Sequence, residues 1–137
     1  MKSTQLAVSA ILFFSSLFFI SCSPDLPYVS TTKEVITQGT WSVDYYYYGA
    51  DKTAQYQNYV FTFSTTGVIK CTNGADVYEG SWSTVKDPSR TDLLTLSLDN
   101  QQPVLGELNG TWNITTINIS NVAMKNGSNT QLIFKKL

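Results

Sequence analysis

Residues 59–84, with the sequence YVFTFSTTGVIKCTNGADVYEGSWST, carry the clearest strand and turn signals of the chain. The first part of this stretch alternates aromatic with non-aromatic residues, and the aromatic positions are Tyr59, Phe61 and Phe63. A period of two residues is the pattern of a β-strand with one buried face. Residues 64–67 and Asn73-Gly74 both predict tight turns, the second being the strongest short hairpin signal. We therefore expect two consecutive hairpins of an antiparallel sheet.

The same alternation extends on both sides of this stretch. A strand is expected after Gly39, and four of its residues should share the inward face: Trp41, Val43, Tyr45 and Tyr47. Beyond residue 84, a loop at 86–89 precedes a strand with three leucines on one face: Leu94, Leu96 and Leu98. Pro103 cannot donate a backbone hydrogen bond, so the segment 100–106 should end that strand.

The last third of the chain predicts three more strands. One face of the first carries four residues: Leu108, Gly110, Trp112 and Ile114. Beyond them the apolar positions shift to Ile117 and Ile119, and such a change of phase predicts a β-bulge at Thr115-Thr116. A short strand, the Asn126-Gly127 turn and a closing strand at 132–136 complete the chain. About eight antiparallel strands result, at the spacing expected of a barrel or sandwich.

A Gly-x-Trp element occurs three times, as Gly39-Thr40-Trp41, Gly80-Ser81-Trp82 and Gly110-Thr111-Trp112. The glycine and the tryptophan of each copy share a strand face, because they are two residues apart. Glycine leaves room where strands coil sharply or a neighbour crosses closely, and the indole covers the gap. The intervals between the copies are unequal, which argues against a repeat array. We expect the three tryptophans to fill the core of a closed sheet.

A separate segment precedes this domain. Lys2 is followed by an apolar run from Leu6 to Ile20, which is shorter than the about 20 residues of a transmembrane helix but fits a secretory signal. The run ends in Phe19-Ile20-Ser21-Cys22, which resembles the lipobox of bacterial lipoproteins. That resemblance implies a signal peptide at residues 1–21 and a lipid on the Cys22 thiol. The alternative is an ordinary secretory cleavage in which Cys22 is incidental.

Residues 22–38 are polar, contain Pro24 and Pro27 and show no strong periodicity, so we expect a lipidated tether ahead of a domain at 39–137. Stable anchoring takes two or more acyl chains, which a mature bacterial lipoprotein usually carries. Ser23, rather than Asp, follows the cysteine, and by analogy with Gram-negative sorting this favours the outer membrane of the cell envelope. The face of that membrane and the oligomeric state stay open.

The composition argues against several classes of function. The net charge is −1 and the chain has no basic run to follow a phosphate backbone, so nucleic acid is not an expected partner. The chain has no histidine, which removes the ordinary Ser-His and Cys-His nucleophile pairs, and its carboxylates are scattered. We therefore expect no enzyme activity, no metal and no cofactor. Cys71 alternates with Ile69 in a strand and is expected to be buried.

The Gly39-Thr40-Trp41 opening resembles the Gly-x-Trp signature of lipocalins. The series 59–63, 78–82 and 112–117 is more specifically similar to the lipocalin-like domain of small Bacteroidota lipoproteins. The resemblance covers residues 39–137 and implies a small, all-β, eight-stranded antiparallel up-and-down barrel, without implying a ligand. The chain departs from the lipocalin pattern because it lacks the second signature motif and the long helix after the barrel.

Two functions compete. In the first, the barrel holds a small apolar or amphipathic ligand in a shallow pocket at its mouth. The expected walls of that pocket are Tyr45, Tyr47, Tyr59, Phe61, Phe63 and Tyr78. In the second, the barrel is solid and its outer surface contacts envelope proteins or glycans, because eight strands leave an interior just wide enough for side chains. We favour the first, since tyrosine combines an apolar ring with a hydroxyl that orients a ligand.

Replacing Cys22 by Ala should release the protein from the membrane fraction, because the substitution removes the thiol that carries the lipid. Mass spectrometry of the native protein should show acyl mass on an N-terminal Cys22. Cys71→Ala removes the other cysteine of the chain and is the control, with unchanged membrane retention. Retention of the Cys22→Ala protein in washed membranes would contradict lipid anchoring.

Overall fold

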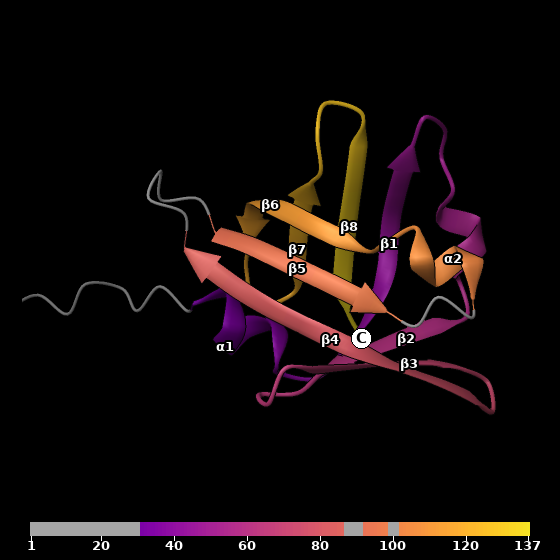
Figure 1. Ribbon diagram of the computed structural model, residues 1–137, viewed down its shortest axis with the longest axis horizontal. Helices are drawn as coiled ribbons and strands as arrows, with labels where there is room; N and C mark the ends of the chain where they lie inside the picture. The colour runs from indigo at the N-terminus through magenta and orange to yellow at the C-terminus, as the bar shows by residue number, and fades with distance from the viewer. Residues whose placement is uncertain (1–30, 87–91, 99–101) are drawn as a thin grey trace, which may run out of the picture.

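A computed structural model describes residues 31–86, 92–98 and 102–137. Eight β-strands form a closed antiparallel barrel, in which each strand pairs with its neighbours in sequence and β8 pairs with β1 (Figure 1). The strands are β1 Thr40–Tyr48, β2 Tyr59–Phe63, β3 Val68–Asn73, β4 Asp76–Lys86, β5 Asp92–Leu98, β6 Gly110–Ile117, β7 Asn121–Lys125 and β8 Thr130–Lys136. The predicted eight-stranded up-and-down barrel is confirmed.

The predicted turns connect these strands. In the β2–β3 turn, Gly67 has a φ of +88° and its N–H donates to the Ser64 carbonyl oxygen (N···O 3.1 Å). In the β3–β4 turn, Gly74 has a φ of +61°. Both values lie in the left-handed region that glycine adopts without strain. The predicted bulge in β6 is also present, because the pairing with β7 shifts between Ile114 and Thr116.

A short helix, α1 (Thr32–Ile36), lies at the end of the barrel where β1 begins (Figure 1). A capping box starts it: the Thr31 hydroxyl accepts from the Glu34 N–H, and the Glu34 carboxylate accepts from the Thr31 N–H. Val35 and Ile36 are buried in the core. The tether predicted to reach residue 38 therefore ends earlier, because the chain is already packed at α1. Residues 1–30, with the predicted signal peptide and Cys22, lie outside the described residues.

Two further helical turns lie at the opposite end of the barrel. They are η1 (Thr53–Tyr56), between β1 and β2, and α2 (Pro103–Gly106), between β5 and β6. The predicted break after β5 is thus a helical turn that starts at Pro103, where the missing N–H costs no helix hydrogen bond. Leu105 and Leu108 are fully buried. No helix in the described ranges is long and apolar enough to cross a membrane.

Side chains fill the interior of the barrel. Trp41, Trp82 and Trp112 are 0%, 5% and 1% exposed, which confirms their predicted place in the core. Each indole N–H donates to a backbone carbonyl oxygen, as a buried indole requires. The acceptors are Ile36 for Trp41 (2.8 Å), Ser64 for Trp82 (3.0 Å) and Leu108 for Trp112 (2.9 Å). Other fully buried large side chains include Tyr46, Tyr56, Phe61, Phe63, Ile69, Leu94, Leu96 and Phe134.

The glycines of the three Gly-x-Trp elements serve two purposes. At Gly80 a Cβ would collide with the Ser97 carbonyl oxygen and lie 2.8 Å from the Leu98 Cα, so the expected close approach of a neighbouring strand occurs here. Gly39 and Gly110 instead have φ values of +91° and +132°, which favour glycine for its backbone freedom. The three tryptophans therefore share a role that their glycines do not.

Trp112→Ala should lower the free energy of unfolding by about 3–5 kcal/mol, because it opens a cavity in a filled barrel. A loss of that size is a large part of the roughly 5–15 kcal/mol that holds a domain folded. Val77→Ala, at a side chain that is 55% exposed, should change stability little. Chemical unfolding followed by circular dichroism measures both variants. Equal stability of the two proteins would mean that Trp112 is not a core residue.

Candidate functional site

The predicted pocket walls lie in different parts of the barrel. Phe61 and Phe63 are 0% and 1% exposed, and their rings contact the Phe134 ring with centroids 5.1 and 5.7 Å apart. Both phenylalanines belong to the filled core, so their predicted place in a pocket wall is wrong. Tyr59 is buried, and Tyr78 is half-buried against the same core.

A β-bulge in β1 decides which tyrosines of the run Tyr45 to Tyr48 face inward. The pairing of β1 with β8 shifts between Val43 and Tyr45, so β1 accommodates one extra residue. Tyr46 therefore lies in the core, whereas Tyr45 and Tyr47 lie on the outer face, where they border a shallow hollow of about 260 Å³. The predicted inward direction of these two tyrosines is wrong, because the bulge reverses the phase of the strand after Val43.

Two buried tyrosines hold α2 against the end of the barrel. The Tyr56 hydroxyl donates to the Val104 carbonyl oxygen (2.6 Å), and the Tyr46 hydroxyl donates to the Glu107 carbonyl oxygen (3.2 Å). Their rings meet edge to face, with centroids 5.2 Å apart. Burial raises the pKa of Tyr46 to about 12 and also raises the pKa of Tyr56, because an ionised phenol loses its solvation there.

A hollow of about 420 Å³ lies on the rim of the barrel beside α2, and we call it the rim hollow. Its lining residues are Tyr48, Glu107, Asn109, Trp112, Asn126 and Thr130. The volume falls within the roughly 300–1,000 Å³ of small-molecule pockets. None of the six predicted wall residues is among them. Two sequence signals point to residues of this hollow: the last tyrosine of the run in β1 and the Asn126-Gly127 turn.

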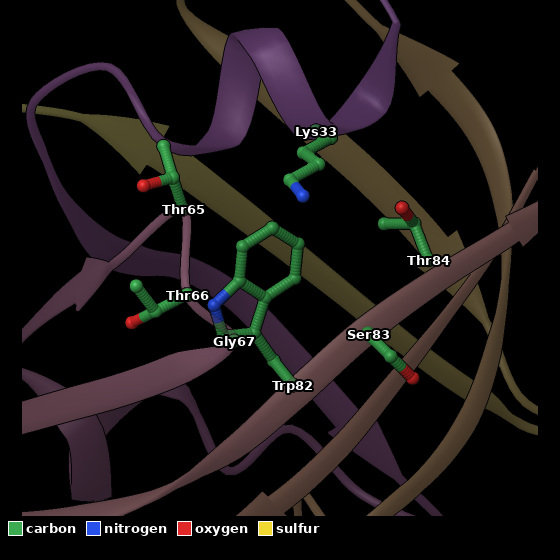
Figure 2. Close-up of a pocket in the computed structure, with 7 residues that line it drawn as sticks. All are labelled: Lys33, Thr65, Thr66, Gly67, Trp82, Ser83 and Thr84. Atoms are coloured by element: carbon green, nitrogen blue, oxygen red, sulfur yellow. The ribbon is translucent and has the colours of Figure 1, made fainter.

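A second hollow, at the α1 end, has a volume of about 230 Å³ (Figure 2). Its lining residues are Lys33, Thr65, Thr66, Gly67, Trp82, Ser83 and Thr84. Figure 2 shows the Lys33 ammonium, carried by α1, directed toward the ring of Trp82. That indole is 5% exposed and its N–H is already bonded to the Ser64 carbonyl oxygen, so it offers a ligand little surface and no donor. We therefore take the larger rim hollow as the candidate site.

The thiol of Cys71 is far from reactive. The residue is fully buried, as predicted, and burial raises the pKa of its thiol to about 12, which keeps the thiol protonated. Among the described residues, no three histidine, cysteine or carboxylate side chains gather in a way that could hold a metal ion.

Comparison with solved structures finds the same barrel in proteins of Bacteroides. A DUF4847 family protein from Bacteroides vulgatus matches with a TM-score of 0.56 and 17% identity, over 78% of this chain and 98% of that one. A lipocalin-like protein from Bacteroides uniformis matches with a TM-score of 0.52 and 16% identity, over 74% and 98%. No protein-family model and no curated protein matches the sequence. The chain has a lipocalin-like barrel fold, as the sequence predicted.

Stability should fall as the pH rises above about 10, where tyrosines of the unfolded chain ionise. Folded Tyr46 keeps its proton up to a pKa of about 12, so between these values the unfolded state binds fewer protons and the free energy of unfolding decreases. This contribution is complete below pH 10, by the same reasoning. Tyr46→Phe should therefore make the alkaline loss of stability shallower than it is in the wild type. Urea unfolding midpoints measured across this pH range test the difference; identical slopes would contradict it.

Proposed function

We propose that the protein is a lipoprotein, anchored through lipid on Cys22 to the outer membrane, that binds a small amphipathic ligand in the rim hollow. The barrel is the rigid support of this site. The ligand-binding role that the lipocalin-like fold supports is kept, and the site moves from the predicted mouth pocket, walled by other residues, to the rim hollow.

One observation carries this proposal. The interior is filled by core side chains, whereas the rim hollow, at about 420 Å³, has the volume of a small-molecule pocket. Its lining combines the exposed aromatic ring of Tyr48 with the polar side chains of Glu107, Asn126 and Thr130. Such a mixture suits a ligand with one apolar face and several polar groups.

The proposed anchor and the rim hollow are compatible in space. The chain enters the fold at α1, and β1 then runs from that end of the barrel to Tyr48 at the rim hollow (Figure 1). Eight residues lie between Cys22 and Thr31, and the nine Cα–Cα steps from one to the other reach at most about 30 Å. A lipid on Cys22 would therefore keep the α1 end near the bilayer and leave the rim hollow at the far end, open to the aqueous phase.

The outer face of β1 and β8 supports a second candidate function, contact with an envelope protein or glycan. The bulge in β1 directs Tyr45 and Tyr47 outward, and Tyr45 lies opposite Ile133 of β8. Ala123 of β7 pairs with the same Ile133, which extends an apolar row across three strands. These side chains are half-buried, so the row is narrow, and we rank it below the rim hollow.

The ligand role predicts a small molecule that co-purifies with the protein. Native mass spectrometry of protein from its own cells should detect this molecule on the wild type. Thr130→Trp should abolish binding of this molecule, because the indole would fill the rim hollow. Tryptophan is itself favourable in a β-strand, so the barrel should still fold. Thr62→Trp, the same change at an exposed position of β2, is the control and should keep the molecule. Equal occupancy in the two variants would place the ligand elsewhere, and its loss on Tyr47→Ala would favour the outer face.

A further inference from the structure

The single charge in the lining of the rim hollow is paired with a lysine outside that lining. The charged residue is Glu107, whose Oε1 lies 2.8 Å from the Nζ of Lys52. The two side chains are only 32% and 25% exposed, so solvent screens their attraction less than on an open surface. An anionic ligand would meet the Glu107 carboxylate, and a cationic one would compete with Lys52. The pair therefore favours an uncharged ligand.

Tyr48 supplies an aromatic ring at the edge of the hollow. It is the last residue of β1 and is 57% exposed. The Lys52 ammonium lies 5.2 Å from the centroid of this ring, so one ammonium contacts both Tyr48 and Glu107. This arrangement places the ring beside the carboxylate. An exposed ring face held in this way can pack against the C–H groups of a ring-shaped ligand.

The loop that carries Lys52 is ordered by its own hydrogen bonds. The Tyr48 N–H donates to the Ala50 carbonyl oxygen (3.0 Å), and the Lys52 N–H donates to the Tyr46 carbonyl oxygen (2.9 Å). The Asp51 carboxylate accepts from the Thr53 hydroxyl (2.6 Å) and the Thr53 N–H (2.9 Å), and these bonds lower the pKa of Asp51. A site ordered before binding loses little entropy when its ligand arrives.

The lining of the rim hollow also carries groups that both donate and accept hydrogen bonds. Asn126 contributes an amide from the β7–β8 turn, and Thr130 contributes a hydroxyl from β8. A Cβ at Gly110 would lie 3.2 Å from the Asn126 Nδ2, so the glycine leaves room for this amide. Asn109 is also part of the lining. Its position is fixed, because its Nδ2 donates to the Leu98 carbonyl oxygen (3.2 Å).

We infer that the ligand of the rim hollow is an uncharged sugar, whose apolar ring face packs on Tyr48 and whose hydroxyls bond to Asn126, Thr130 and Glu107. Sugar hydroxyls both donate and accept, so they match an amide, a hydroxyl and a carboxylate in one small space. A fatty acid would offer Asn126 and Thr130 fewer hydrogen-bonding groups than a sugar, and its carboxylate would meet the carboxylate of Glu107. The inference rests on the proposed function, because it names the ligand class of the same hollow.

Saturation-transfer NMR on the mature, acylated protein in lipid nanodiscs tests the ligand class. The probes are D-galactose, D-glucose and N-acetyl-D-glucosamine as neutral sugars, D-galacturonate and D-galactosamine as charged ones, and decanoate as an apolar anion. We expect signal from at least one neutral sugar and weaker signal from its charged counterparts. Tyr48→Ala and Asn126→Ala should each weaken binding by about tenfold, equivalent to about 1.4 kcal/mol. Val77→Ala, of similar exposure to Tyr48, is the control and should bind as the wild type does.

The outcomes separate this inference from the proposed function. Binding of decanoate without any neutral sugar, lost on Thr130→Trp, would overturn the sugar and keep the ligand-binding role. Absence of binding for all six probes, with no co-purified molecule, would overturn both. Sugar binding that Tyr48→Ala leaves unchanged would overturn the assigned site. Tyr48→Phe should lose less sugar affinity than Tyr48→Ala, because phenylalanine keeps the aromatic ring. This order of affinities would support packing of the sugar on the ring face.

Discussion

The backbone pairing of β1 with β8 closes the sheet, and the width of the resulting barrel constrains the rest of the molecule. Eight strands leave an interior just wide enough for side chains or for one small ligand. In this protein side chains occupy the interior, which contains the indoles of Trp41 and Trp112 and the rings of Phe61, Phe63 and Phe134. A binding function compatible with this packing has to use the rim or the outer face of the barrel.

Filling a barrel with indoles also dictates how its ends are built. A buried indole N–H needs an acceptor, and inside a closed sheet the strand carbonyls are already paired. Trp41 finds its acceptor at Ile36 of α1, and Trp112 finds its own at Leu108, just after α2. The segments that close the two ends of the barrel therefore also accept the hydrogen bonds of these buried indoles. Within the described ranges, every buried side-chain nitrogen and oxygen has a hydrogen-bond partner.

The bulge in β1 links the core, the closure of the barrel and the candidate site. One extra residue turns Tyr46 inward, where its hydroxyl bonds to the Glu107 carbonyl oxygen and holds the segment after α2. The same segment presents the Glu107 side chain to Lys52, which in turn contacts the ring of Tyr48. The rim hollow thus depends on the register of one strand, although its lining comes from β1, β6, β8 and two connecting segments.

Most of the fold could be predicted from the amino-acid sequence. Period-two alternation identified the strands, Asn73-Gly74 and the other turn signals set their order, and the phase shift after Ile114 located one bulge, because apolar–polar contrast records which face is buried. Other features depend on contacts between segments that are distant in the sequence. Four consecutive tyrosines in β1 show no such contrast, so the sequence does not indicate the second bulge. The helix α1 has only five residues, which is too short for a helical period to be recognised. The rim hollow could not be predicted from the sequence either, because Tyr48, Glu107 and Asn126 become neighbours only when β1 and β8 close the sheet.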